Sequence, residues 1–209
     1  MSGTVLILAP HTDDGELGCG GTIAKFVEEE RDVHYVAFSD AHTSLDDRWP
    51  KDQLRTELTN ADRVLGLERE NVRVLDFEVR RFPEFRQDIL QEIIGLRRSL
   101  SPELVFVPSP NDIHQDHQVI AREGLRAFKN QTILGYEEPW NNIVFETRCF
   151  VTLEERHVER KVAALRCYET QRERKYLDAE FIRALARTRG TQLEKTWAEA
   201  FEVLRMVMP

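Results

Sequence analysis

Short apolar runs along this chain alternate with longer segments in which apolar residues recur at helical spacing. The run at 5–9 is rich in branched residues, as expected of a strand buried on both faces. Segments such as 54–65 carry their apolar residues on one face of a helix. Strand and helix repeated in this order predict right-handed crossovers and a mainly parallel sheet with helices on both faces. We therefore expect an α/β, Rossmann-like fold with strands at 5–9, 34–39, 72–77, 103–107, 132–136 and 148–153, and helices at 54–65, 89–96 and 119–128.

The last third of the chain is expected to be mostly helical. The stretch 152–155 reads Thr-Leu-Glu-Glu, which fits a capping box that opens a long helix through Leu165 to Gln171. Gly190 is placed to end a further helix, and residues 197–207 are again apolar. No stretch rich in Ser, Gly or Pro separates this portion from the rest. We expect one domain over residues 1–209, with a helical C-terminal portion packed on the sheet.

Composition and charge narrow the classes of partner. The chain is 41% hydrophobic and 32% charged, which is typical of a globular protein, and its net charge is −8. Such a chain has no overall attraction to nucleic acid or acidic lipid, and no apolar run approaches the roughly 20 residues that span a bilayer. Cys19, Cys149 and Cys167 lack the spacing of a disulfide framework, which indicates free thiols and a cytoplasmic location. We expect no nucleic-acid or membrane partner.

A cluster of ionisable side chains follows the first predicted strand. His11, Asp13 and Asp14 lie close together, and the glycine-rich stretch 15–21 leads to Thr22, which is placed to cap a helix. Open parallel sheets bind ligands at this point, beyond the carboxyl ends of their strands. Two adjacent carboxylates repel each other unless something positive compensates, and a divalent metal is the simplest such partner. The alternative is an ordinary turn of Asp and Gly with a solvated histidine.

A second cluster makes a metal site the better interpretation. His114, Asp116 and His117 follow the fourth predicted strand and enter a helix, so both clusters open onto the same edge of the sheet. Catalytic zinc typically keeps three protein ligands and one open position. His11 and Asp14 would complete that set together with one of the two later histidines.

The remaining polar side chains suit the other parts of a hydrolase. Asp13 could take a proton from water on the metal, and the histidine that is not a ligand could donate to a developing oxyanion or a leaving amine. Asp116 could orient a ligand imidazole. Together these parts predict a metal-dependent hydrolase.

The order of these motifs resembles a known enzyme family. His-x-Asp-Asp, then Gly-Cys-Gly-Gly-Thr, and His-x-Asp-His about 100 residues later are similar to the motifs of the PIG-L/LmbE zinc-dependent N-deacetylases. Further similarities around Leu65-Gly66, Lys161 to Gln171 and 186–201 extend the resemblance over nearly the whole chain. The resemblance implies removal of an acetyl group from an N-acetylglucosamine-type sugar or sugar conjugate. It also implies a Zn²⁺ cofactor, with Fe²⁺ as another divalent ion that suits the ligands, and a homo-oligomer.

By position, the resemblance implies a role for each candidate residue. It implies zinc ligation by His11, Asp14 and His117, proton transfer by Asp13 as general base, protonation or oxyanion stabilisation by His114, support of the histidines by Asp116, and a position near the base or substrate for Arg55.

The chain departs from the family pattern near the first motif and again near residue 168. Gly15 stands where Glu is usual, with the acid one place later at Glu16, and Thr12 stands where Pro is usual. Tyr168 replaces a frequent His. These departures leave the role of Glu16 open and bear on the substrate side of the site more than on the metal.

Other functions remain as alternatives. The glycines at 18–21 could open a nucleotide-binding helix, although Asp13 and Asp14 would repel a pyrophosphate there. A non-catalytic metal-binding protein would need only the ligands. A serine hydrolase is not favoured, because the chain has no Gly-x-Ser-x-Gly motif. Tyr136 and Trp140 could stack on a sugar ring or serve only in packing.

Overall fold

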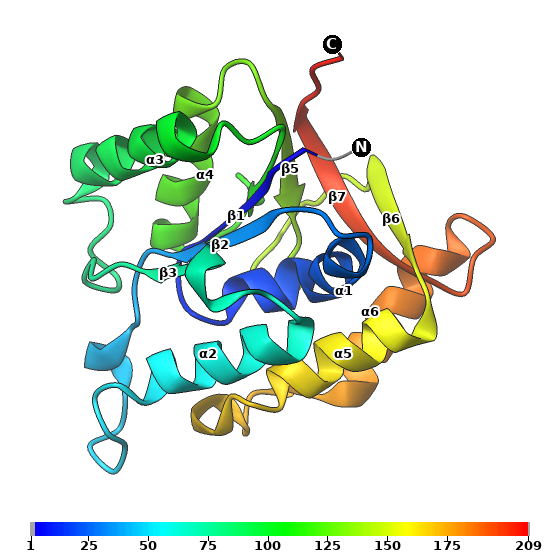
Figure 1. Cartoon of the computed structure of the whole chain (residues 1–209). Helices are drawn as coiled ribbons and strands as arrows, with labels where there is room; N and C mark the ends of the chain where they lie inside the picture. The colour runs from blue at the N-terminus through cyan, green and yellow to red at the C-terminus, as the bar shows by residue number, and fades with distance from the viewer. Residues whose placement is uncertain (1–2, 209) are drawn as a thin grey trace.

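A computed structural model describes residues 3–208 of the chain (Figure 1). Its strands form one seven-stranded sheet in the order β3-β2-β1-β4-β5-β7-β6. The strands β1 to β5 pair in parallel, whereas β7 is antiparallel to both of its neighbours. The predicted α/β fold with a mainly parallel sheet is confirmed. The strands are β1 (Val5–Ala9), β2 (Val33–Ala37), β3 (Val72–Val74), β4 (Leu104–Pro108), β5 (Thr132–Tyr136), β6 (Cys149–Leu153) and β7 (Trp197–Arg205), and the α-helices are α1 (Asp14–Glu28), α2 (Gln53–Leu65), α3 (Arg86–Leu100), α4 (Gln115–Ala127), α5 (Glu155–Leu165) and α6 (Ala179–Thr191).

Two hydrophobic layers cover the sheet, one on each face. In β1, Val5, Ile7 and Ala9 pack in the layer built with α1, α2 and α5, whereas Leu6 and Leu8 pack in the layer built with α3 and α4. Successive side chains of a strand point to opposite faces, which is why a central strand with helices on both sides is apolar throughout. Figure 1 shows α3 and α4 on one side of the sheet and α1, α2 and α5 on the other.

The strand order places the two predicted clusters together. The central strand β1 lies between β2 and β4, and all three run in the same direction. The chain leaves β1 towards β2 and later returns on the other side of β1 as β4. The loops that follow β1 and β4 therefore meet beyond the carboxyl edge, at the point where the strand order reverses.

Helix α1 begins earlier than the sequence predicts. It starts at Asp14, with Asp13 as its N-cap residue, so Thr22 lies inside the helix and does not cap it. The glycines that suggest a loop lie inside the helix, where neighbouring side chains leave little room for a β-carbon. A β-carbon on Gly15 would lie 2.4 Å from the Tyr35 ring. Tertiary packing here overrides the low helix propensity of glycine.

Gly18 provides a test of this packing. A β-carbon at Gly18 would lie 2.3 Å from the buried ring of Tyr136, so Gly18→Ala should lower the free energy of unfolding by about 1–3 kcal/mol. Gly95 in α3 is a matched control, because a β-carbon there would have no neighbour within 4 Å. Gly95→Ala should be neutral or stabilising by up to about 1 kcal/mol. Urea unfolding of both variants measures the difference, and a destabilisation common to both would contradict the packing argument.

The C-terminal portion contains the predicted helices but ends in a strand. Helix α5 stops at Leu165, and only a short 3₁₀ turn lies at Glu169–Gln171, so the predicted long helix to Gln171 is wrong. Its capping box also lies further along the chain: Glu154 is the N-cap residue and His157 its partner, while Thr152 belongs to β6. The apolar stretch at the end of the chain is β7 rather than part of a helical portion.

A buried charge explains why β7 is hard to recognise in the sequence. Glu199 faces the interior, where it accepts hydrogen bonds from Lys161 at 2.6 Å and from the backbone N–H groups of Gly21 and Thr22 at 3.0 and 2.6 Å. An inward-facing carboxylate interrupts the alternation of polar and apolar residues that marks a strand. Among the helices of residues 3–208, none is long and apolar enough to cross a bilayer.

Candidate active site

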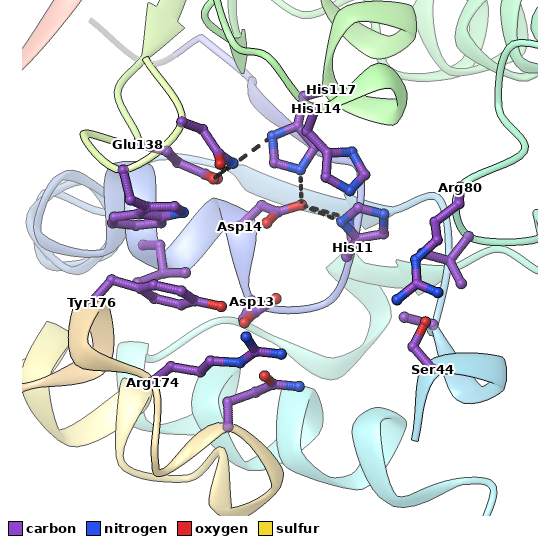
Figure 2. Close-up of a pocket in the computed structure, with 16 residues that line it drawn as sticks. His11, Asp13, Asp14, Ser44, Arg80, His114, His117, Glu138, Arg174 and Tyr176 are labelled. Carbon is purple, nitrogen blue, oxygen red and sulfur yellow. Dashed lines mark hydrogen bonds and ion pairs between the residues drawn. The ribbon is translucent and has the colours of Figure 1, made fainter. Parts of the chain in front are cut away.

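The two motifs meet at the carboxyl edge of β1 and β4. His11 follows β1, Asp14 is the first residue of α1, His114 is the N-cap residue of α4, and His117 lies in the first turn of α4. Figure 2 shows these four side chains pointing towards one another. The three histidine rings have centroids 4.6–5.3 Å apart.

Asp14 forms the centre of this group. Its Oδ2 accepts a hydrogen bond from the backbone N–H of His11 at 2.7 Å, which turns the carboxylate back towards the loop. The same oxygen lies 3.1 Å from His11 Nδ1 and 3.3 Å from His117 Nε2. One carboxylate oxygen and two ring nitrogens from separate segments of the chain thus converge.

A buried carboxylate stands behind each of these two imidazoles. His11 Nε2 lies 3.0 Å from Asp116 Oδ2, and His117 Nδ1 lies 2.8 Å from Asp112 Oδ2. Both carboxylates are almost fully buried. A carboxylate that accepts the outer N–H of an imidazole fixes the ring and leaves the inner nitrogen free to bind a metal, which is the usual arrangement around ligand histidines.

His114 is held differently from the other two histidines. Its Nδ1 accepts a hydrogen bond from the backbone N–H of Asp116 at 3.2 Å, as part of the helix cap. Burial and the neighbouring imidazoles of His117 and His11 lower the pKa of His114 to about 4. The ring is therefore neutral at pH 7. Because Nδ1 is the acceptor, the proton of the neutral ring sits on Nε2, which leaves an N–H group available as a hydrogen-bond donor.

The carboxylates and imidazoles of the cluster shift one another's pKa values towards the charged forms. Burial by itself would lower the pKa of His11, but Asp14 and Asp116 raise it to about 9. Burial would likewise lower the pKa of His117, yet Asp14 and Glu138 hold it well above its usual value. Burial would raise the pKa of Asp14, but His117 and His11 hold it well below its usual value. The group thus has the charge distribution of a cation site. A bound metal would displace the protons that the imidazoles carry without it.

Asp13 lies beside this group, with its carboxylate turned away from that of Asp14 and into the pocket. Its carboxylate lines the pocket and accepts no side-chain hydrogen bond from another residue within 3–208. Figure 2 shows the carboxylate of Asp13 pointing to the opposite side of the loop from that of Asp14. Burial and the negative charge of Asp14 raise the pKa of Asp13 to about 6. A carboxylate with a pKa near neutrality and a free lone pair is suited to accept a proton.

The donor set fits a zinc ion. Two donor atoms on a tetrahedral zinc ion with bonds of about 2.0–2.1 Å lie roughly 3.3 Å apart. The distances of 3.1 and 3.3 Å from Asp14 Oδ2 to the two ring nitrogens agree with that spacing. Two groups of three residues could each hold a metal ion, because within each group the possible ligand atoms lie within 4.8 Å of one another. The first group is His11, His114 and His117, and the second is Asp14, His117 and Glu138. The predicted ligands combine members of both groups.

Two acidic residues at the site were missed in the sequence. Asp112 supports His117, and its Oδ1 also accepts the backbone N–H of His114 at 2.7 Å, which shapes the loop. Glu138 follows β5, and its Oε2 lies 3.7 Å from His117 Nδ1. Burial and the charge of Asp14 raise the pKa of Glu138 well above its usual value. The rule that locates the motifs at the carboxyl edge would also have found Glu138, because β5 ends one strand away.

Arg55 is not at this site. Its Nε lies 2.7 Å from Asp40 Oδ2, its guanidinium also pairs with Asp76, and it does not line the pocket. The expectation that Arg55 lies near the base or substrate has no support in this geometry. The position of Arg55 on the first turn of α2 does not determine where its guanidinium lies, because a long side chain there can reach either side of the helix. The arginines that do line the pocket are Arg80 and Arg174.

Glu16 has a structural place beneath the loop that carries the ligands. The hydroxyls of Tyr35 and Tyr168 lie 2.9 and 2.7 Å from the carbonyl oxygen of Thr12, and both also contact the Glu16 carboxyl group. Burial and the charge of Asp62 raise the pKa of Glu16 well above its usual value. The departures from the family pattern at 12, 15, 16 and 168 thus belong to one buried network.

A pocket of about 380 Å³ opens over the candidate ligands, within the size range of small-molecule sites. Trp140 and Tyr176 form one wall, with their rings stacked at 4.3 Å between centroids and 15° between planes. Tyr136, in contrast, is buried and donates its hydroxyl to the carbonyl of Leu8 at 3.1 Å. Of the two aromatic residues considered for sugar stacking, only Trp140 reaches the pocket.

Comparison with known proteins agrees with the motifs. A family model described as PIG-L: GlcNAc-PI de-N-acetylase matches residues 6–128, which include both clusters. The chain belongs to this family. Among curated family relatives, the chain is 29% identical over 132 residues to a diacetylchitobiose deacetylase of Thermococcus kodakarensis, a match that covers 59% of this chain and 48% of that protein. The match thus spans about half the length of that relative.

Solved structures show how widely this family fold is used. A conserved protein of Thermus thermophilus superposes with a TM-score of 0.81 and 26% identity, over 98% of this chain and 96% of that one. A 4-carboxy-2-hydroxymuconate hydratase of Pseudomonas putida superposes with a TM-score of 0.78 and 20% identity, over 99% and 98%. The fold therefore does not specify the reaction, and function has to be inferred from the site.

Proposed function

We propose that this protein is a metal-dependent hydrolase that removes the N-acetyl group from an N-acetylated amino sugar or sugar conjugate. Membership of the PIG-L family and the similarity to a diacetylchitobiose deacetylase support this reaction. The observation that carries the proposal is the pair of carboxylate-backed imidazoles, His11 and His117, whose inner nitrogens converge on Asp14. His11, Asp14 and His117 would hold the metal, with zinc the best fit and Fe²⁺ a second candidate.

The residues around the ligands supply the other parts of the reaction. A bound zinc ion would lower the pKa of a coordinated water to about 7 and polarise the amide carbonyl. Asp13 accepts the proton that the attacking water loses and can return it to the leaving amine. His114 donates its Nε2–H to the oxygen of the amide as negative charge develops there. Asp116 and Asp112 keep the two ligand imidazoles oriented.

The pocket also indicates how the sugar would bind. Trp140 and Tyr176 form an apolar wall beside the acidic residues, and since each ring covers one face of the other, a sugar would pack against an outer face or the ring edges. Aromatic faces suit the apolar face of a pyranose ring, while the polar residues at the floor contact the acetamido group. In this pose the acetamido group points to His11 and His117, and the rest of the substrate extends towards the pocket mouth.

The alternatives are less well supported by the same features. The glycines of α1 pack against Tyr35, Tyr136 and Lys161 inside a helix, so they do not form a loop that could cradle a phosphate. A silent metal-binding protein would not need the accessible Asp13 or the oriented donor on His114. A hydratase remains a second candidate, because a neighbour in fold has that activity and a metal-activated water suits both reactions.

Acetate release tests the proposal. Purified protein with its zinc content measured should release acetate from a panel of N-acetylated sugars, among them N-acetylglucosamine and N,N′-diacetylchitobiose, and a chelator should abolish the activity. Added zinc or Fe²⁺ should restore it. Zinc-loaded protein that releases no acetate from any member of the panel would refute the deacetylase proposal.

Asp112 gives a further test of the metal site. Asp112→Asn should weaken zinc binding by about 10- to 100-fold, because an amide is a poorer acceptor for the outer N–H of His117. Competition with a chromophoric chelator measures the affinity. Asp47→Asn, an exposed acid in the loop before α2, is the matched control and should bind zinc as the unmodified protein does. Equal affinities in both variants would show that His117 does not depend on Asp112.

A further inference from the structure

Two arginine side chains reach the pocket without an acidic partner. Arg80 and Arg174 both line it, and among residues 3–208 neither guanidinium lies within the 4.0 Å of a carboxylate oxygen that defines an ion pair. Figure 2 shows both guanidinium groups directed into the pocket, Arg80 beside His11 and Arg174 below Asp13. The next residue, Arg81, is different, because it pairs with the surface acids Glu78 and Glu84.

The backbone at Arg80 is fixed to the candidate metal centre. Its φ of 69° lies in the left-handed region, which side chains with a β-carbon rarely adopt. Asp116 holds this conformation by accepting the backbone N–H of Arg80 at 2.6 Å and that of Phe82 at 3.2 Å. The same carboxylate contacts His11 Nε2 at 3.0 Å. One buried carboxylate therefore sets the positions of both His11 and Arg80, and strained backbone of this kind is typical of functional sites.

The pocket is lined by groups of both charges. The acidic groups that line it, Asp13, Asp14 and Glu138, lie around the histidines at the floor. The two arginines come from the segment before α3 and from the turn before α6, and Figure 2 shows them on different sides of this group. A substrate whose acetamido group lies at His11 and His117 can extend another part of the molecule to Arg80. A guanidinium matches carboxylate and phosphate groups by paired hydrogen bonds, and that of Arg80 finds no such partner among the described residues of this chain.

We propose that the substrate carries a carboxylate or phosphate on the part remote from its acetamido group, and that Arg80 binds this group. Arg80 is then a residue that determines specificity, while the metal ligands and Asp13 serve every substrate alike. Arg174, on the other side of the pocket, adds to the positive field. The inference rests on the proposed deacetylase function and specifies its substrate class.

The test compares anionic and neutral N-acetylated monosaccharides. The anionic probes are the 6-phosphate of N-acetylglucosamine and N-acetylglucosaminuronic acid, which carry the anion at C6, away from the acetamido group at C2, and the neutral probe is methyl N-acetylglucosaminide. For zinc-loaded protein, the best anionic probe should exceed the neutral one in kcat/KM by at least about 10-fold. Arg80→Met should lower kcat/KM for that probe by about 10- to 100-fold and change the neutral probe by less than about threefold. Arg80→Lys should recover part of the loss, and Arg81→Gln should leave both rates unchanged.

Two results would overturn the proposal: a neutral probe at least as good as every anionic one, or an Arg80→Met variant that slows both equally. If no probe releases acetate, the deacetylase function fails, and Arg80 is judged by binding alone. Calorimetric titration of the same probes then gives the answer. Tighter binding of an anionic probe by the unmodified protein than by Arg80→Met supports the inference, and equal affinities refute it.

Discussion

Asp13→Asn should keep its metal and lose its turnover. The two adjacent aspartates differ in geometry: Asp14 Oδ2 lies 3.1 and 3.3 Å from two ring nitrogens, whereas the carboxylate of Asp13 points into the pocket. An amide at position 13 cannot accept a proton. The expected loss in kcat is about 10²–10⁴-fold, the usual effect of removing a positioned general base.

Zinc content and acetate release measured on the same samples check this expectation. His114→Ala should give a similar result, because His114 presents an N–H donor and not a free lone pair to the site. Glu16→Gln is a useful comparison, since it alters the buried network without removing a group from the pocket. If Asp13→Asn lost its metal, Asp13 would be a ligand; if it retained full activity, the proposed proton transfer would be wrong.

Asp14→Asn and His117→Ala should instead lose the metal. Asp14 is the only carboxylate whose oxygen lies within 3.3 Å of both candidate nitrogens among the described residues. Since changes behind a ligand already weaken metal binding by about 10- to 100-fold, removal of a ligand should cost at least about 100-fold. Zinc retention after dialysis at about pH 8 measures this. A neutral pH would be less favourable, because His11, with a pKa of about 9, competes for protons.

Glu138→Gln distinguishes the predicted ligand set from its alternative. Glu138 joins Asp14 and His117 in a second group of possible ligands. If the metal is held by His11, Asp14 and His117, Glu138→Gln should retain zinc while Asp14→Asn does not. If zinc were lost from Glu138→Gln and kept by a His11→Ala variant, the metal would be bound by the second group, nearer to β5.

The sequence predicts the parts of this protein that follow from periodicity and strand order. Buried runs such as 5–9 and 103–107 are visible because a central parallel strand is apolar on both faces. The meeting of His11 and His117, far apart in the chain, follows from the general rule for open α/β sheets. Periodicity and strand order are therefore sufficient for the fold class and for bringing the two motifs together.

The remaining features depend on side-chain packing that periodicity does not contain. The glycines of α1 lie inside the helix, where the rings of Tyr35 and Tyr136 leave no room for a β-carbon. Strand β7 is hard to recognise from the sequence because it contains Glu199, a carboxylate whose charge is balanced inside the protein by Lys161. The orientation of Arg55 towards Asp40 and Asp76 is decided by neighbours distant in sequence. Such pairings require the three-dimensional structure.

The carbonyl of Thr12 shows that the N-terminal and C-terminal parts of the chain are energetically coupled. It is held by hydroxyls from Tyr35 in β2 and from Tyr168, which lies after α5. Glu199 in β7 likewise holds the backbone of α1. The ligand loop therefore belongs to the same cooperative unit as residues beyond the segment 6–128 that matches the family model. Transient opening of the C-terminal part would release this loop. Amide hydrogens near His11 would therefore exchange with solvent at least as fast as the C-terminal part opens.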